Sequence, residues 1–175
     1  MLNIYLTNLG KYNEGELIGE WVELPCDDFE SVFERIGISD EPDENGRYYE
    51  EYFITDYETD VNGLKVGEYD NLDDLNELAE AIEEDLEKAE ALIYFGYSEA
   101  DEIREHIDDI IYITSCKAWE NSDYEIGYYY AETMGCLEIP DYLKNYFDYE
   151  AYGRDIRIEG SFYETESGDI YEMIA

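Results

Sequence analysis

Carboxylates are the most abundant side chains in this sequence that could bind a ligand or take part in catalysis. They are densest between residues 70 and 90. That stretch contains ten aspartates and glutamates against one lysine, Lys88. One acidic row recurs every three or four residues, a spacing that places its members along one side of an α-helix. The members of the row are Asp73, Glu77, Glu80, Glu84 and Glu87. Such a row can attract cations or a positively charged partner.

The acidic stretch works against its own helix. Like charges three or four residues apart destabilise a helix by roughly 0.2 to 0.5 kcal/mol per pair. Residues 70–90 contain ten such acidic pairs, so we expect repulsion on the order of 2 to 5 kcal/mol before salt screening. This is a large part of a typical stability of about 5 to 15 kcal/mol. With Lys88 as the only local compensating charge, the pattern indicates that the negative charge itself is functional.

Catalytic residues other than carboxylates are scarce. The single histidine, His106, lies in the helical stretch IREHIDD, and no GxSxG, HExxH or GxxxxGK[ST] motif occurs. Hydrolysis by two carboxylates requires environments that push their pKa values apart, and nothing in the sequence marks such a pair. We therefore expect no enzymatic activity, no catalytic residues and no cofactor, and we interpret His106 as a solvated surface residue.

Two acidic turns resemble the opening of a calcium-binding loop, EPDENG at 41–46 and ETDVNG at 58–63. An EF-hand loop begins with aspartate and needs a bidentate glutamate at its twelfth position. Both turns begin with glutamate, and their twelfth positions hold Tyr52 and Tyr69. We interpret them as acidic turns without a metal ligand set.

The charge of the whole chain restricts its partners. The 175 residues include 48 acidic and 10 basic side chains, which gives a formal net charge of -38, but 45% of the residues are hydrophobic and 20 are tyrosines. This much apolar surface indicates a soluble, folded protein rather than a disordered chain. The basic residues are scattered singly, so we expect no direct binding to nucleic acid or to anionic membranes.

The sequence predicts a cytoplasmic location and reduced thiols. No run of 18 apolar residues occurs, and the N-terminus lacks a basic region and a long apolar segment, so neither a membrane span nor a signal peptide is expected. Cys26, Cys116 and Cys136 are odd in number and form no CxxC pair. They are typical of unpaired structural cysteines rather than of a disulfide framework or a zinc site.

Hydrophobic spacing predicts the elements that must position the carboxylates. In the first third, strands are expected at 3–8, 16–24 and 48–58, and a helix at 27–37. In the centre, apolar residues recur at intervals of three and four residues, which predicts one helix over 72–92 capped by Asn71. These residues are Leu72, Leu75, Ala79, Ile82, Leu86 and Ala89. Ser98 and Asp101 form a capping-box pattern before the next helix.

The last third is expected to mix both kinds of element. A strand is predicted at 110–114, a helix at 124–135, a second helix from Pro140 to residue 147, and a β-hairpin over 155–174. The fold class is therefore α+β, with a helical acidic centre and small antiparallel sheets at both ends. We expect three small domains, at 1–61, 62–103 and 104–175.

The density of charge approaches that of a nucleic acid. Residues 70–90 carry a net charge of -9 over roughly 30 Å of helix, about half the density of a duplex with one charge per about 1.7 Å. The -38 of the whole chain equals the phosphates of roughly 19 base pairs. Three explanations remain open: solvation in concentrated salt as in halophiles, low-affinity cation binding, and imitation of nucleic acid.

Two stretches of the chain resemble the most characteristic parts of the ArdA antirestriction proteins, which conjugative plasmids and transposons carry. They are NIYLTNLGKYNEGELIGEWVELP at 3–25 and IPDYLKNYFDYEAYGRDIRIEGSF at 139–162. The similarity runs in order over nearly the whole chain. The resemblance implies an elongated homodimer of three-domain subunits that mimics bent B-form DNA. It also implies that the target is a Type I restriction-modification enzyme, and that the protein occupies the DNA-binding groove of the enzyme's methyltransferase core. YYYAETMGCLEIPDY at 128–142 resembles the antirestriction motif of the family, which is implicated in dimer contacts.

We choose the candidate site residues from helical phase and local charge, because the acidic positions of the family are not a fixed motif. The expected DNA-mimic carboxylates are Asp70, Asp73, Asp74, Glu77, Glu80, Glu83, Glu84, Glu87, Glu90, Glu99, Glu102, Glu105 and Asp109. Two subunits of charge -38 repel each other, so a dimer interface must be locally apolar. From Tyr128 to Pro140 only Glu132 and Glu138 are charged. The expected interface residues are Tyr128, Tyr129, Met134, Leu137 and Ile139.

Overall fold

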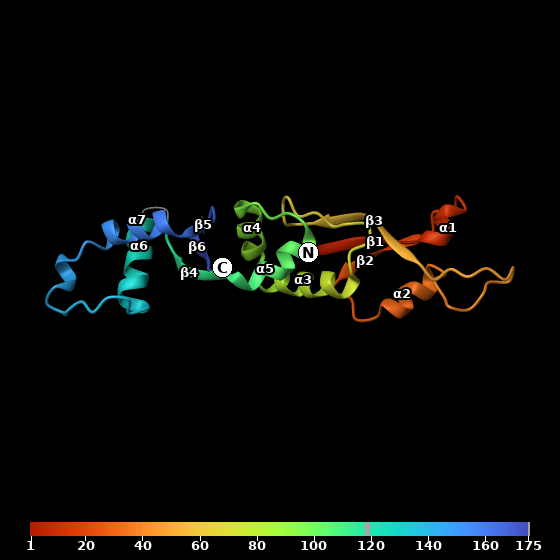
Figure 1. The fold of residues 1–175 in the computed structure, drawn as a ribbon, viewed down its shortest axis with the longest axis horizontal. Helices are drawn as coiled ribbons and strands as arrows, with labels where there is room; N and C mark the ends of the chain where they lie inside the picture. Colours follow the sequence, from red (N-terminus) through yellow and green to blue (C-terminus); the bar gives the residue numbers. More distant parts are fainter. Residues whose placement is uncertain (118–119, 175) are drawn as a thin grey trace. The chain divides into compact units, whose positions relative to one another are not determined.

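The structure is a computed structural model that describes residues 1–117 and 120–174, and it confirms a mixed α+β fold (Figure 1). Contacts between residues divide the chain into two compact units, Met1–Ile107 (unit 1) and Asp108–Ala175 (unit 2). Each unit contains one three-stranded antiparallel sheet. A finer division of the chain into three domains stays a proposal.

The elements of unit 1 are β1 (Leu2–Asn8), α1 (Leu9–Asn13), β2 (Gly19–Leu24), α2 (Phe29–Arg35), β3 (Tyr52–Thr59), α3 (Leu72–Glu84), α4 (Leu86–Phe95) and α5 (Ala100–His106). The 3-10 turn η1 (Ile107–Asp109) leads into unit 2. The elements of unit 2 are β4 (Ile110–Ser115), α6 (Ser122–Tyr128), the π-helical turn η2 (Tyr129–Thr133), the 3-10 turn η3 (Lys144–Tyr146), α7 (Tyr149–Glu159), β5 (Ser161–Glu164) and β6 (Asp169–Met173).

The sheet of unit 1 has the order β2-β1-β3, so β1 is its central strand. Leu2, Ile4 and Leu6 of β1 alternate with more polar residues and are almost completely buried, as a half-covered strand requires. At the end of the strand the Asn8 side chain accepts a hydrogen bond from the Lys11 amide and caps α1. Its amide nitrogen also donates to backbone carbonyls at the end of α2, which ties both helices to the sheet.

Helix α3 provides the acidic centre and buries one apolar stripe. Its buried residues are Leu72, Leu75, Leu78, Ala79 and Ile82. The side chain of Asn71 accepts hydrogen bonds from the amides of Asp73 and Asp74 at 2.8 and 3.2 Å, which confirms the predicted N-cap. Contacts of α3 with β2, α4 and α5 make it a link between the sheet and the helices α4 and α5.

The prediction of one continuous helix over 72–92 is wrong, because the chain leaves the helical conformation at Asp85 (φ -155°, ψ 90°). Acidic residues crowd positions 83–87, and their repulsion together with the weak helix propensity of aspartate favours a break there. After the break, Ala89, Ala91 and Leu92 of α4 are completely buried. Burial of this second apolar face stabilises two short helices in place of one long helix.

The predicted capping box at Ser98 and Asp101 is also wrong. Helix α5 begins after Glu99, and within the described residues that position makes no side-chain capping bond. The Ser98 hydroxyl instead accepts a hydrogen bond from the Lys65 ammonium at 2.9 Å. Because the N-cap position of α5 is Glu99, Ser98 lies outside the helix and does not cap it.

In unit 2, the sheet order is β4-β6-β5, and α6 crosses α7 through two glycines. A Cβ atom on Gly127 would lie 1.9 Å from the carbonyl oxygen of Tyr149, and one on Gly153 would lie 1.8 Å from that of Asp123. Only glycine permits such a close approach of two backbones. The core beneath the helices contains Ile113, Cys116, Ile126 and Ile170.

Three predictions for unit 2 need correction. The helix expected over 124–135 begins as α6 but continues as the π turn η2, in which the Met134 amide donates to the Tyr129 carbonyl at 2.9 Å. Of the helix expected at 140–147, only the single turn η3 forms. The hairpin of β5 and β6 is confirmed, with Gly168 in the left-handed region (φ 94°). Residues 155–159, however, are the end of α7 rather than a strand.

The alternation of Ile156 and Ile158 suggested that strand, but two residues at period two do not distinguish a strand from a helix. Tyr149, Gly153 and Ile156 also recur at intervals of four and three residues, which fits a helix face. Packing against α6 selects the helix and leaves Ile158 exposed to 74%. No helix within the described ranges is long and apolar enough to cross a membrane.

Candidate acidic and apolar interaction surfaces

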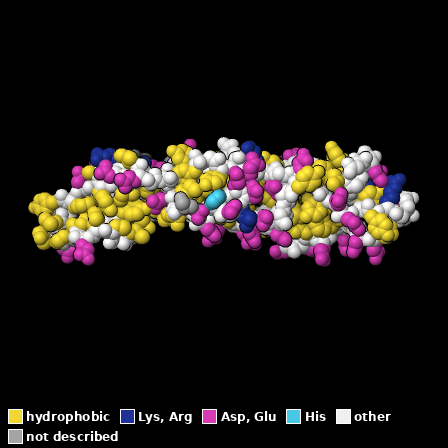
Figure 2. All heavy atoms as spheres, in the orientation of Figure 1, with side chains coloured by type: hydrophobic (Ala, Val, Ile, Leu, Met, Phe, Trp, Pro, Cys, Tyr) yellow, Lys and Arg dark blue, Asp and Glu magenta, His cyan; other side chains and the backbone are white. Residues whose placement is uncertain are grey.

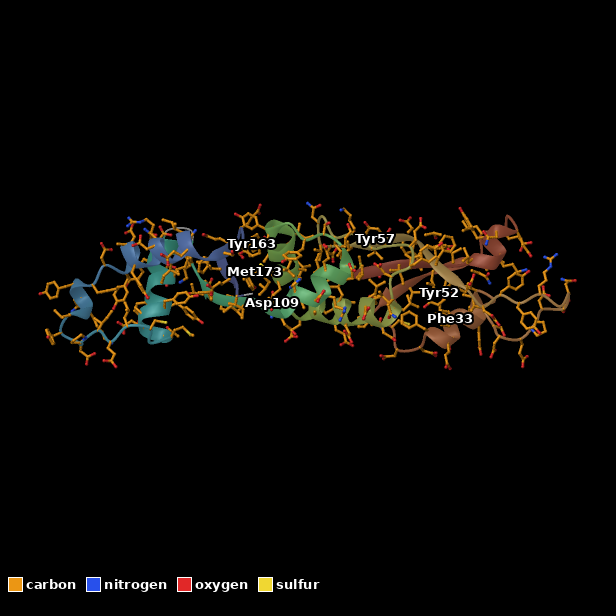
Figure 3. All side chains as sticks on the ribbon, viewed as in Figure 1. Phe33, Tyr52, Tyr57, Asp109, Tyr163 and Met173 are labelled. Carbon is orange, nitrogen blue, oxygen red and sulfur yellow. The ribbon has the colours of Figure 1, made fainter. Side chains whose placement is uncertain are left out.

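Twelve of the thirteen predicted carboxylates lie in unit 1, and Asp109 lies in unit 2, where it is labelled in Figure 3. The exposed residues are Asp73, Glu77, Glu80, Glu83, Glu84, Glu99, Glu102 and Glu105. The half-buried residues are Asp70, Asp74, Glu87, Glu90 and Asp109. The structure therefore supports most of the predicted set as surface residues, with α3 as their main source.

Helices α3 and α5 contact each other, and Arg104 joins their acidic surfaces. The Arg104 guanidinium lies 3.6 Å from the Asp74 carboxylate and 3.2 Å from the Glu77 carboxylate. Lys88 was the expected compensating charge for residues 70–90, but Arg104 of α5 reduces the repulsion in the first half of α3. Glu77 is thus exposed but partly neutralised.

The predicted row of five carboxylates is not one continuous surface. Asp73, Glu77, Glu80 and Glu84 lie on α3, whereas Glu87 lies on α4 beyond the break. Two other predicted residues have local structural roles. The Asp70 carboxylate accepts a hydrogen bond from the Gly67 amide at 2.8 Å, and Glu99 forms an ion pair with Lys65 at 3.0 Å.

Glu80, Glu83 and Glu84 in the second half of α3 have no hydrogen bond or ion pair within the part of the chain that the structure describes. All three side chains are exposed. Their charge is therefore fully available to an external partner, and we call them the α3 carboxylates below.

Basic residues are matched by carboxylates of the same chain. Within the described residues at least eight of the ten form an ion pair, including Lys11, Arg35, Arg47, Lys65, Arg104, Lys144, Arg154 and Arg157. Figure 2 shows acidic side chains spread over the visible face of unit 1, with basic side chains only as isolated groups. Such a surface presents a negative field without a cationic patch.

In both acidic turns an aspartate already has a partner within the chain. The Asp43 carboxylate accepts hydrogen bonds from the amides of Arg47 and Asn45, and these bonds hold the pKa of Asp43 below its usual value. In the second turn, Asp60 pairs with the N-terminal ammonium of Met1 at 3.2 Å. Among the described residues, no group of three or more His, Cys, Asp or Glu side chains is placed to hold a metal ion.

Histidine and cysteine side chains have structural surroundings. His106 is half-buried, and its ring lies 4.9 Å from that of Tyr97, so it is less solvated than the sequence indicated. Cys26, Cys116 and Cys136 are free thiols. Burial raises the pKa of Cys116, which makes its thiolate scarce and the thiol unreactive.

Both units also contain contacts between aromatic rings. In unit 1, the rings of Phe33 on α2 and Tyr52 on β3 stack with centroids 5.0 Å apart (Figure 3). In unit 2, the exposed rings of Tyr124 and Tyr128 both contact the buried ring of Tyr149. Some of the tyrosines thus pack helices and sheet together, whereas others, such as Tyr142 and Tyr146, remain exposed.

The five predicted interface residues divide into surface and core. Tyr128 and Met134 are exposed to 45% and 58%. Leu137 and Ile139 are half-buried, and Tyr129 packs against the core cluster of unit 2. The structure therefore keeps Tyr128 and Met134 as the most accessible members and assigns Tyr129 to the core.

Sequence reasoning missed the most exposed apolar residues of unit 2. Tyr142 and Tyr146 are exposed to 75% and 85%, and Leu143 between them is also exposed. Figure 2 shows that hydrophobic side chains cover much of the visible face of this unit. The four large apolar side chains of PDYLKNYF at 140–147 were visible in the sequence. The prediction of a helix there did not indicate that these side chains would be exposed.

Glu132 lies between this exposed segment and the helices. Its carboxylate accepts hydrogen bonds from the Lys144 ammonium at 2.6 Å and from the Tyr149 hydroxyl at 2.5 Å. These two bonds lower the pKa of Glu132, and the bond to Glu132 raises the pKa of Tyr149 to about 12. Unit 2 contains a second hydrogen bond from a tyrosine to a glutamate, in which the Tyr130 hydroxyl donates to the Glu172 carboxylate of β6.

One protein-family model, described as antirestriction protein (ArdA), matches residues 4–171. No curated protein matches the chain significantly. The matched range includes the acidic helices of unit 1 and the tyrosine-rich segment of unit 2, so both candidate surfaces fall within it. The chain belongs to the ArdA family of antirestriction proteins.

Proposed function

We propose that this protein inhibits Type I restriction-modification enzymes by occupying the DNA-binding groove of their methyltransferase core. Its membership of the antirestriction family supports the class of target. The α3 carboxylates, which are exposed and have no partner within the described residues, carry the mechanism. In this proposal the protein is an inhibitor without enzymatic activity or cofactor, and it acts in the cytoplasm.

The physical basis is that a groove for DNA must be basic, because neutralisation of phosphates supplies much of the affinity for nucleic acid. Exposed carboxylates on α3 and α5 can take the place of phosphates in such a groove. Because most basic side chains are already paired within the chain, few cations remain to repel the groove. Long-range attraction then makes association fast.

We further propose that the protein is a homodimer joined through unit 2. Each subunit has a net charge of -38, so subunits can meet only where apolar burial outweighs repulsion. The exposed apolar residues that support this surface are Tyr128, Met134, Tyr142, Leu143 and Tyr146. A dimer would offer the charge of roughly 38 base pairs, enough for a long enzyme groove.

Competition with DNA tests the mechanism. A labelled duplex that contains the target site is bound to a purified Type I methyltransferase core, and the protein is added at increasing concentration. We expect the protein to displace the duplex, and its affinity to fall steeply between low and physiological salt. Simultaneous binding of protein and duplex to the enzyme would contradict occupation of the groove, even if restriction were still inhibited.

A further inference from the structure

The segment from Leu137 to Tyr146, which we call the strap, carries the two most exposed aromatic side chains among the described residues of unit 2, Tyr142 and Tyr146, but has little structure of its own. Its only helical element is the single turn η3. The backbone hydrogen bonds at 140–147 join residues of the same segment, such as Leu143 to Pro140 and Tyr146 to Leu143. A segment with so few bonds to the rest of the fold is expected to open easily.

One side chain anchors the strap from outside. Within the described residues, the bond from the Lys144 ammonium to Glu132 is the one hydrogen bond or ion pair that joins residues 137–146 to another element. The same carboxylate accepts from the hydroxyl of Tyr149 at the start of α7. Glu132 therefore connects η2, the strap and α7 through its two oxygens.

The geometry suits a firm anchor. The Glu132 side chain is only 15% exposed, whereas Lys144 is 39% exposed. Hydrogen bonds to an ionised partner are roughly twice as strong as neutral ones, and shielding from water strengthens them further. Asp141 also lies 3.4 Å from the Lys144 ammonium, but it belongs to the strap itself and is almost fully exposed.

We infer that Glu132 is a positioning residue that holds the strap, through Lys144, in the shape in which Tyr142, Leu143 and Tyr146 meet a second copy of the chain. This inference rests on the homodimer proposed above and adds the residue that orders its surface. Ordering the strap before association lowers the entropy cost of binding, since the aromatic side chains then need not be fixed during it. Glu132 itself need not touch the second subunit.

The test compares Glu132→Gln with Glu166→Gln in the full chain. Both changes remove one negative charge from unit 2, but Glu166 lies outside the strap, is exposed and has no hydrogen bond or ion pair within the described residues. Two quantities are measured: amide hydrogen exchange of residues 137–146, and the dimer dissociation constant by analytical ultracentrifugation. Circular dichroism checks that each variant remains folded at the temperature used.

We expect E132Q to speed exchange in the strap and to weaken the dimer, each by about tenfold or more, as loss of a charged hydrogen bond predicts. E166Q should change both quantities by less than about twofold, because a solvated surface charge contributes little. Lys144→Met should reproduce E132Q with the carboxylate intact, whereas Lys144→Arg should preserve both properties. Should E132Q fail to fold, the two lysine variants provide the same comparison.

The outcomes separate this inference from the proposal on which it rests. If E132Q dimerises as tightly as the parent protein, the positioning role of Glu132 is wrong, but the proposed homodimer stands. Faster exchange without a weaker dimer has the same meaning, because the bond would then serve only the fold of unit 2. A parent protein that stays monomeric at all concentrations overturns the proposed homodimer, and the positioning role falls with it.

Discussion

Gly127 and Gly153 are the residues at which the backbones of α6 and α7 approach each other most closely. Each would place a Cβ atom within 2 Å of a carbonyl oxygen of the opposite helix. Neither clash can be relieved by rotation of a side chain, since the obstacle is backbone. The two glycines thus fix the helix crossing from which the strap and η2 extend.

We expect Gly127→Ala to destabilise the protein by about 1 to 3 kcal/mol or more, because overpacking forces the two helices apart. Thermal unfolding followed by circular dichroism measures the effect. Asp155→Ala on the exposed side of α7 is the control and should change stability by less than about 0.5 kcal/mol. Equal stability of the two variants would show that the helices do not cross at Gly127.

Two carboxylates in unit 2 respond to pH in opposite directions. Burial, and then the charge of Glu120, raises the pKa of Glu125, whereas hydrogen bonds from Lys144 and Tyr149 lower that of Glu132. Glu125 therefore favours the folded state below its ordinary pKa of 4.5, and this contribution is lost as the pH rises through the raised value. Glu132 favours the folded state above 4.5 and ceases to do so as the pH falls through its lowered value.

At pH 7 we accordingly expect Glu125→Gln to raise the unfolding temperature and E132Q to lower it. Both differences should shrink as the pH is lowered, that of E125Q near and above pH 4.5 and that of E132Q below it. Thermal unfolding of both variants and the parent across pH 3 to 7 would measure these differences. A shift of the same sign in the two variants would mean that net charge, not local environment, controls their contribution.

At the scale of elements, α3 combines a buried apolar stripe with an exposed acidic surface whose charges are only partly compensated. Arg104 of α5 lies against Asp74 and Glu77 in its first half, whereas the second half carries the α3 carboxylates. Repulsion thus remains concentrated near the C-terminal end of α3, where the macrodipole is also negative and adds to it. A cationic partner would relieve this repulsion on binding.

Changing all three α3 carboxylates, Glu80, Glu83 and Glu84, to glutamine should stabilise the protein by roughly 1 kcal/mol at low salt, because three like-charge pairs are removed. The same variant should inhibit the target enzyme less well, whereas a single amide should have little effect because exposed charges are screened beyond about 8 Å. Denaturation and a restriction assay would measure the two effects.

A matched control changes three exposed glutamates of the loop before β3, Glu41, Glu44 and Glu50, to glutamine. It alters the net charge by the same amount, so it separates total charge from charge placed on α3. Equal loss of inhibition in the two triple variants would indicate that only the total field matters.

At the scale of the whole molecule, two of the three explanations for the net charge of -38, solvation in concentrated salt and imitation of nucleic acid, differ in the salt that folding requires. The structure contains ordinary apolar cores in both units and ion pairs at most of its basic residues. Neither feature requires molar salt. We expect the far-ultraviolet circular dichroism spectrum to be that of a folded protein at about 0.1 M salt; folding only in molar salt would favour the halophile explanation.

Replacing Tyr142 and Tyr146 together by glutamate should convert the proposed dimer into monomers. Two charges per subunit at an apolar interface add repulsion and remove aromatic burial. Because both side chains are highly exposed, these changes disturb the fold less than charges at the half-buried Leu137 or Ile139. Light scattering would measure the mass, and a variant that remains dimeric would place the interface on another surface.

The sequence by itself determined the α+β class, the buried stripe and N-cap of α3, the C-terminal hairpin and the acidic character of the surface. These features depend on local spacing, propensity and total charge, which are read directly from the residues. Most of the predicted carboxylates lie at the surface, because the helical spacing places them on the side of the helix opposite the buried apolar stripe.

Only the tertiary structure decided the break at Asp85, the π turn η2, the helical state of residues 155–159 and the pairing of Arg104 with α3. The break at Asp85 combines local acidic repulsion with a second apolar face to bury on α4, residues 155–159 are helical because α7 packs against α6, and the compensating cation of α3 comes from α5. The exposure of the strap and its anchor at Glu132 belong to this group, because burial and pairing across a fold have no fixed spacing along the chain.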